Sequence, residues 1–197
     1  MTISLMPDKT RVIVIGGGRA GFIKAKAFSK RGCRVFVLSR EFMEEFRELE
    51  DAGNVTLIRE NYDKSYIIDK HIVVIATDNE ELNNSIKKNC EDLYKIYLTC
   101  SDFEKGMFIT PVQGETEEIN FSVHTRSGSP RTSVFIAHGI QEYLKEYDGF
   151  VKYICSLRKS LKGFPMKDEI MKLVNTKEFY EKYKAGKYRE FIENILK

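Results

Sequence analysis

The stretch Arg11–Lys26, RVIVIGGGRAGFIKAK, constrains the fold more than any other part of this sequence. Its branched apolar residues predict a strand buried on both faces, and Gly16, Gly18 and Gly21 follow in G-x-G-x-x-G spacing. A helical repeat of apolar residues begins directly afterwards. The first glycine permits a tight turn, the second lets the backbone approach a pyrophosphate, and the third lets helix and strand pack closely. The stretch therefore predicts a dinucleotide-binding loop, with phosphates held by the free N–H groups of the helix.

Composition excludes several classes of protein. The chain has 197 residues and a formal net charge of +3, which is too small to indicate a nucleic-acid-binding protein. No apolar run approaches the roughly 20 residues that span a membrane, and the first ten residues do not resemble a secretory signal. The four cysteines are widely separated and the three histidines lack ligand spacing. We expect reduced thiols, no metal site and a cytoplasmic location.

Strands alternate with helices over the first half of the sequence. After the strand Arg11–Ile15, further strands are expected at 34–38, 55–58, 72–76 and 96–99, with helices at 19–31, 41–52 and 79–90 and a short helix or turn at 62–68. This alternation predicts a parallel sheet with right-handed crossovers, so the first part should be a Rossmann-type domain.

The pattern changes in the second half. Strands are expected at 107–112 and 119–124 around a polar loop, followed by a glycine–serine–proline loop at 125–131 and a helix at 132–147. From 149 to 197 the sequence is helical, with breaks at 163–165, 175–176 and 185–186. The fold class expected is α/β, a Rossmann-type parallel sheet followed by a small α+β segment and a C-terminal helical domain.

The second strand ends in VLSRE, where a dinucleotide site normally has an acid that holds the ribose 2′-OH. Leu38 and Ser39 occupy the expected place, and Glu41 comes about two residues late. Ser39 can still donate to a ribose hydroxyl. Arg40 can lie against adenine, meet a 2′-phosphate or remain solvated, so the residues alone leave NAD and NADP open.

Polar residues follow two other strands at the edge where ligands bind in parallel sheets. Thr77 and Asp78 follow the strand at 72–76 and should face the cofactor, although Asp78 or Asn79 can also cap the next helix. Asp102 follows the strand at 96–99 and is a candidate acid or base, or an ordinary turn aspartate. His124 and His138 are interpreted as structural.

Five segments resemble one family in their order along the chain. VIVIGGGRAGFIKAKAF, VFVLSREF, VVIATDNEELN, FITPV and TRSGSPR resemble siroheme synthase N-terminal domains, which are precorrin-2 dehydrogenases and in some members also sirohydrochlorin ferrochelatases. The resemblance runs from about Thr10 to the C-terminus. ATDNEELN and SGSP are its most specific parts, because they are not general Rossmann features.

The resemblance implies an enzyme that oxidises precorrin-2 to sirohydrochlorin with NAD, as a homodimer without nucleic-acid or membrane partners. Some members then insert Fe²⁺, or their product enters a cobalt branch. The implied domains are 1–112 for NAD binding, 113–145 for dimerisation and 146–197 as a helical domain. The implied cofactor contacts are Gly16, Gly17, Gly18, Arg19, Ala20, Gly21, Ser39, Arg40, Glu41, Ala76, Thr77 and Asp78.

The same resemblance places the loop 127–131 against the tetrapyrrole. Precorrin-2 carries many carboxylates, and we expect nearby cations to form charge-assisted bonds to them. Ungapped alignment puts Ser101 where bifunctional members have a key aspartate, with Asp102 one residue later; which of the two takes that role bears on metal insertion. The expected catalytic residue is Asp102, and the expected substrate contacts are Ser101, Lys105, Arg126, Ser127, Gly128, Ser129 and Arg131.

Two other functions remain open at this level. One is a nucleotide-sensing regulatory module, such as those that gate potassium transport, but such modules usually keep the acid after the second strand. The other is a tetrapyrrole-binding paralogue without catalysis, which Ser101 and Arg40 leave open.

Overall fold

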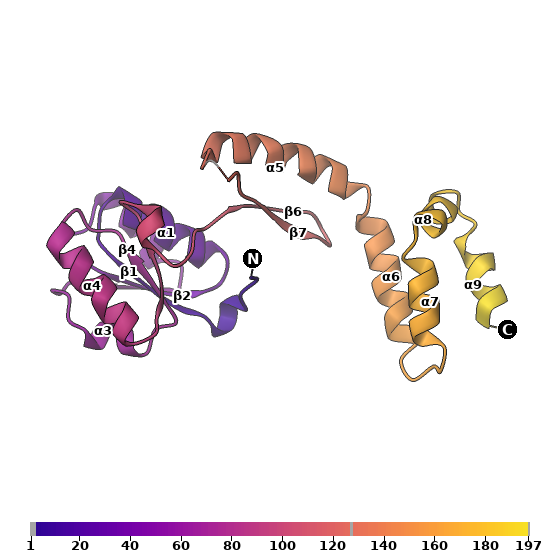
Figure 1. The fold of residues 1–197 in the computed structure, drawn as a ribbon, viewed down its shortest axis with the longest axis horizontal. Helices are drawn as coiled ribbons and strands as arrows, with labels where there is room; N and C mark the ends of the chain where they lie inside the picture. Colours follow the sequence, from indigo (N-terminus) through magenta and orange to yellow (C-terminus); the bar gives the residue numbers. More distant parts are fainter. Residues whose placement is uncertain (1–2, 127, 197) are drawn as a thin grey trace. The chain divides into compact units, whose positions relative to one another are not determined.

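The computed structural model describes residues 3–126 and 128–196. It forms two compact units, Met1–Thr110 and Pro111–Lys197 (Figure 1). Each unit has its own apolar core.

The first unit contains a parallel sheet of five strands. In chain order these are β1 (Arg11–Ile15), β2 (Arg34–Leu38), β3 (Val55–Ile58), β4 (Ile72–Ile75) and β5 (Ile96–Thr99). They lie in the order β3-β2-β1-β4-β5, and each neighbouring pair is parallel. The order reverses between β1 and β4, so the carboxyl ends of these two strands form the switch point where such sheets bind ligands.

Both faces of the sheet are covered, as the continuous apolar runs of the strands predict. Val12 and Val14 share one core with α1 (Arg19–Lys30) and α2 (Arg47–Glu50). Ile13 and Ile15 share the other with α3 (Ser65–Ile68) and α4 (Glu80–Asp92). Alternate side chains of one strand thus pack against helices on opposite faces of the sheet.

The expected helix at 41–52 is wrong over its first part. Residues 41–43 are not helical, and only η2 (Glu44–Phe46) and α2 follow. The Met43 N–H donates to the Gly17 carbonyl at 3.0 Å, which ties this segment to the glycine loop in an extended conformation. A tertiary hydrogen bond therefore overrides a local helical pattern.

The second unit begins with a hairpin, β6 (Val112–Glu115) antiparallel to β7 (Asn120–Val123). The expected strand at 107–112 is wrong, because pairing starts only at Val112. The Met107 N–H instead donates to the Tyr97 carbonyl at 2.8 Å, in the first unit. Pro111 has no N–H to give to a ladder.

Short 3₁₀ turns also occur at η1 (Pro7–Lys9) and η3 (Phe103–Lys105).

Helices complete the second unit: α5 (Pro130–Lys145), α6 (Asp148–Ser160), α7 (Lys167–Val174), α8 (Lys177–Lys184) and α9 (Tyr188–Leu196). Ile170, Val174 and Phe179 form the centre of a core shared by the last four. The predicted breaks are confirmed, with Gly163 and Gly186 at positive φ and Thr176 capping α8. Within the described ranges, no helix has the length and apolar character needed to cross a membrane.

Candidate functional site

The three glycines of the motif have three different environments. Gly16 has φ +126°, and a Cβ there would lie 2.3 Å from the Ala76 carbonyl oxygen. A Cβ on Gly21 would lie 2.1 Å from the Gly16 oxygen. Gly18 has an ordinary φ of −86°, and a Cβ there would meet no atom of the described residues within 4 Å. Packing therefore requires the first and third glycines, while the open space at Gly18 fits a ligand that approaches the backbone.

The start of α1 is suited to an anion. Among residues 3–126 and 128–196 no side chain caps it, its first turn contains no acid, and Gly18, Arg19 and Ala20 are exposed. The first N–H groups of a helix have no partner within the helix and lie at the positive end of its dipole. This geometry fits a pyrophosphate, with Arg19 adding a cation.

The residues after β2 lie against the same loop. A Cβ on Gly17 would lie 2.0 Å from the Glu41 carbonyl and 2.8 Å from Ser39 Oγ, so the position between the first two motif glycines must also be glycine. Ser39 is half-buried, and Arg40 and Glu41 are exposed. The Ser39 hydroxyl and the Glu41 backbone carbonyl therefore lie directly beside the phosphate loop.

After β4, capping of the next helix and facing the cofactor fall to different residues, whereas the sequence left both roles open for Asp78. Asn79 caps α4, accepting from the Leu82 N–H at 2.9 Å. Thr77 hydrogen-bonds to Asn83 through both its hydroxyl, at 2.6 Å, and its carbonyl, at 2.9 Å. Asp78 is left exposed, next to Thr77 and Ala76 at the end of the strand.

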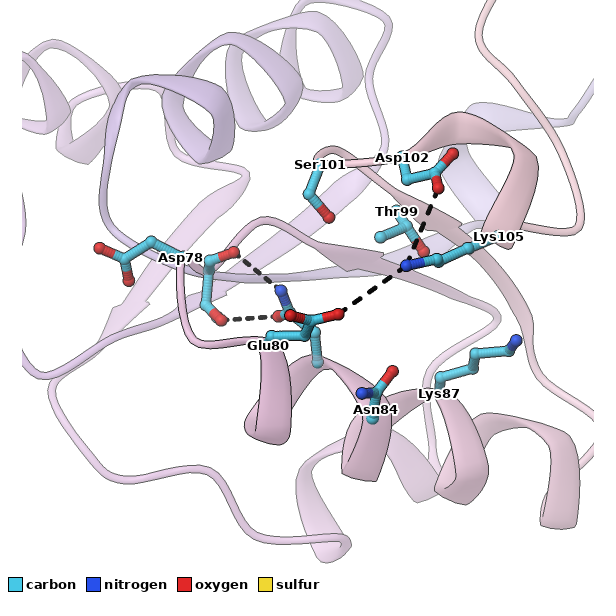
Figure 2. A pocket seen from close by; sticks show the side chains of 10 residues that line it. Asp78, Glu80, Asn84, Lys87, Thr99, Ser101, Asp102 and Lys105 are labelled. Carbon is cyan, nitrogen blue, oxygen red and sulfur yellow. Dashed lines mark hydrogen bonds and ion pairs between the residues drawn. The ribbon is translucent and has the colours of Figure 1, made fainter.

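A cleft of about 370 Å³ opens beside these residues. Figure 2 shows it between the ends of β4 and β5, the start of α4 and η3. It is lined by Thr77, Asp78, Glu80, Asn83, Asn84, Lys87, Thr99, Ser101, Asp102 and Lys105. The cleft brings together five residues predicted for the site: Thr77, Asp78, Ser101, Asp102 and Lys105.

Asp102 has the local role expected of a turn aspartate, and it also faces the cleft. Its carboxylate accepts from the Glu104 N–H at 3.1 Å and caps η3. Lys105 Nζ lies 3.9 Å from this carboxylate and 3.9 Å from that of Glu80 (Figure 2). Ser101 is exposed. Burial raises the pKa of the neighbouring Cys100 thiol, which keeps that side chain neutral.

The sequence analysis missed Thr99 and the α4 residues of the cleft, Glu80, Asn83, Asn84 and Lys87. Thr99 is the last residue of β5, and a polar residue ending a buried strand was the available signal. The α4 residues recur at three- and four-residue spacing, so they share one helix face.

The remaining predicted substrate contacts lie in the second unit, and Ser127 lies outside the described residues. Arg126 and Arg131 are exposed at the two ends of the loop. Gly128 has φ +68°, and the Ser129 N–H donates to Thr125 Oγ1 at 2.8 Å. The loop is thus held by its own hydrogen bonds in front of α5. Within residues 3–126 and 128–196, no three His, Cys, Asp or Glu side chains gather in a way that could hold a metal ion.

Comparisons with known proteins agree with this geometry. Residues 3–112 match the model of a family described as "Putative NAD(P)-binding". A Methanocaldococcus jannaschii protein named "Putative precorrin-2 dehydrogenase" is 28% identical, over 100% of this chain and 96% of its own length. The "Precorrin-2 dehydrogenase" of Priestia megaterium is 21% identical, over 100% and 98%.

Longer relatives match this chain over only part of their own length. A "Siroheme synthase" of a Psychrobacter species is 25% identical over 92% of this chain but only 36% of its own sequence. Among solved structures, "SirC, precorrin-2 dehydrogenase" superimposes with a TM-score of 0.72 at 20% identity, covering 99% of this chain and 98% of that one. This superposition shows that the two proteins have the same fold. The chain belongs to the siroheme synthase N-terminal domain-like family of NAD(P)-binding proteins.

Proposed function

We propose that this protein is a precorrin-2 dehydrogenase, which oxidises precorrin-2 to sirohydrochlorin with NAD⁺. The observation that carries the proposal is the open space at Gly18, at an uncapped helix start. The names and nearly full-length coverage of the M. jannaschii and P. megaterium relatives support the substrate.

The cofactor proposed is NAD rather than NADP. Ser39 supplies a hydroxyl for the adenosine ribose, and the negative charge of Glu41, two residues later in the sequence, disfavours a 2′-phosphate. Arg40 makes no ion pair within the described part of the chain, and its guanidinium is free to stack on adenine. Comparing kcat/KM for NAD⁺ and NADP⁺ tests this choice, and a preference for NADP⁺ would contradict it.

The oxidation removes a hydride and a proton from the macrocycle. Bound NAD⁺ supplies the hydride acceptor, and the protein must position the ring and accept the proton. We assign proton acceptance to Asp102, whose carboxylate faces the cleft. Ser101 and Lys105 lie at the same edge and contact the substrate.

The carboxylates of precorrin-2 need positively charged side chains to bind them. Arg126 and Arg131, with Gly128 and Ser129 between them, form an exposed polar loop suited to charge-assisted bonds. We assign this loop to substrate binding.

A homodimer is proposed from the surface of α5. Val134, Phe135, Ile136 and Tyr143 are exposed on this helix, with 78% of Phe135 accessible. Ser133 and Ala137 are buried on this helix, and Phe135 lies on the side of the helix opposite to them. Exposed apolar side chains gathered on one helix are typical of an interaction site, and a second copy of this chain is the occupant that the family resemblance implies.

One experiment tests the function. The protein is mixed with precorrin-2 and NAD⁺, and the absorbance of NADH and of sirohydrochlorin is followed. Equal production of both supports the proposal. Binding without turnover would indicate a tetrapyrrole-binding paralogue, and nucleotide binding without tetrapyrrole affinity a regulatory module. Adding Fe²⁺ or Co²⁺ to the product tests metal insertion separately.

A further inference from the structure

Thr99 carries an unexplained buried hydroxyl. The residue is 7% exposed, and its Oγ1 is the single buried side-chain polar atom among the described residues without a hydrogen-bond partner. A buried hydroxyl without a partner costs on the order of 1–3 kcal/mol. Valine has the same shape as threonine and would pack equally well at position 99.

The hydroxyl belongs to the cleft at the ends of β4 and β5. Thr99 lines this cleft together with the carboxylates of Asp78, Glu80 and Asp102 and the ammonium of Lys105. In Figure 2 the Thr99 and Lys105 side chains are both directed into it. The cleft volume, about 370 Å³, suits one aromatic ring with its sugar rather than a whole tetrapyrrole.

The Lys105 side chain, which lines the same cleft as Thr99, can move while the backbone around it stays fixed. Behind Lys105, the Met107 N–H donates to the Tyr97 carbonyl at 2.8 Å, and a Cβ on Gly106 would lie 3.2 Å from the Thr99 nitrogen. Within the part of the chain that the structure describes, the Lys105 ammonium is held only by its two 3.9 Å ion pairs, with side chains 41–81% exposed. Exposed pairs of this kind contribute little stability.

The sheet topology indicates which part of a dinucleotide reaches this cleft. With the pyrophosphate at the start of α1 and the adenosine towards β2, the other half of the molecule extends across the switch point over β4 and β5. That half carries a nicotinamide ring with a carboxamide. The three carboxylates of the cleft favour the positive charge of the oxidised ring.

We propose that the Thr99 hydroxyl donates a hydrogen bond to the carboxamide oxygen of the nicotinamide ring, which enters the cleft as Lys105 swings away. This inference rests on the proposed function, because it assumes that the loop after β1 binds NAD. It makes Thr99 a residue that orients the ring. The displaced Lys105 is then free to meet a substrate carboxylate.

The test compares two ligands by titration calorimetry. NAD⁺ carries the carboxamide, whereas ADP-ribose lacks the whole nicotinamide ring. Thr99→Val should weaken NAD⁺ binding about tenfold, corresponding to ~1.4 kcal/mol, and leave ADP-ribose binding unchanged. Thr99→Ser should bind NAD⁺ as the wild type does.

Thr10 provides a matched control. It is also 7% exposed, but its hydroxyl donates to the Met6 carbonyl at 2.7 Å. Thr10→Val should lower the melting temperature without changing NAD⁺ affinity. Thr99→Val should leave the melting temperature of the free protein unchanged or raise it, because it removes an unpaired buried polar atom.

A second ligand makes the test independent of the variant. Thionicotinamide adenine dinucleotide has a sulfur, a weaker acceptor, in place of the carboxamide oxygen. The wild type should bind NAD⁺ more tightly than this analogue, and Thr99→Val should bind the two about equally.

Three results would overturn the inference: unchanged NAD⁺ affinity in Thr99→Val, equal weakening of NAD⁺ and ADP-ribose, or no preference of the wild type for NAD⁺ over its thio analogue. If the wild type bound neither NAD⁺ nor ADP-ribose, the proposed function itself would fail.

Discussion

At the scale of single residues, the loop after β1 shows that glycines in one motif are needed for different reasons. Gly16 and Gly21 are required by backbone atoms of the chain, which a side chain would strike at 2.3 and 2.1 Å. Gly18 meets no such obstacle. A mutation at each position should therefore separate folding from ligand binding.

We expect Gly18→Ala to change the free energy of unfolding by no more than about 1 kcal/mol, because its methyl group enters open space at a helix cap. The same methyl group should weaken NAD⁺ binding about tenfold or more by blocking the pyrophosphate. Gly21→Ala, the matched control, should lower stability by ~1–3 kcal/mol through overpacking against Gly16. Denaturant unfolding and calorimetry measure the two effects. Unchanged NAD⁺ affinity in Gly18→Ala would contradict the phosphate site.

Arg131 is the loop cation that we expect to matter most for the substrate. Arg131→Ala should raise KM for precorrin-2 about fivefold with little change in kcat, because an exposed charge pair contributes ~1 kcal/mol. Arg131→Lys should restore part of the loss. Arg158→Ala, which removes an exposed arginine from α6, is the control. Steady-state kinetics provide the measurement, and an unchanged KM would remove Arg131 from the site.

At the scale of elements, Asp148 joins the hairpin turn to α6. Its carboxylate accepts from the Thr116 hydroxyl at 2.5 Å and from the Glu117 and Glu118 N–H groups at 3.2 and 3.1 Å. Asp148 is also the first residue of α6, where a negative charge is favoured. One side chain therefore fixes the register between a turn and a helix 30 residues away.

This arrangement predicts a pH dependence. The hydrogen bond from Thr116, followed by those from the backbone, lowers the pKa of Asp148 below its ordinary value of 3.8. The stabilisation is therefore complete above pH 3.8 and is lost as the pH falls through the lower folded-state pKa. Asp148→Asn should lower the melting temperature at neutral pH, and the difference from the wild type should shrink in acid. Asp168→Asn, in the first turn of α7, is the control, and an equal effect of the two substitutions would contradict this role.

How much the sequence predicts also differs by element. The central strands β1 and β4 were predictable because Val12–Ile15 and Ile72–Ile75 are continuous apolar runs, and the breaks at Gly163 and Gly186 because glycine takes positive φ. The predicted helix at 41–52, over its first part, and the predicted strand at 107–112 were wrong. Hydrogen bonds from Met43 and Met107 to carbonyls elsewhere in the chain decide the conformation of these segments. The glycine motif located the phosphate site, but Thr99 required the fold, since its hydroxyl is unusual only once its surroundings are known.

At the scale of the whole molecule, the residues assigned to one reaction are divided between two units. The glycine loop, Asp102 and the cleft belong to Met1–Thr110, whereas Arg126 and Arg131 belong to Pro111–Lys197. Cofactor binding should therefore need only the first unit. Turnover of precorrin-2 should need the second as well, and we propose that it also needs dimerisation through α5.

Phe135→Ser tests that proposal, because Phe135 is the most exposed of the apolar residues on α5, at 78%. Interfaces of stable dimers bury about 800 Å² on each partner around apolar anchors, so removing a central phenyl ring should convert dimer to monomer. Light scattering at several protein concentrations measures the mass. Phe103→Ser, which changes a 58% exposed phenylalanine of η3, should leave the mass unchanged. The monomer should keep wild-type affinity for NAD⁺ but oxidise precorrin-2 more slowly, since only the step that involves the second unit is affected. A Phe135→Ser protein that stays dimeric would rule out this face of α5, and a monomer with full turnover would show that one copy of the chain holds a complete site.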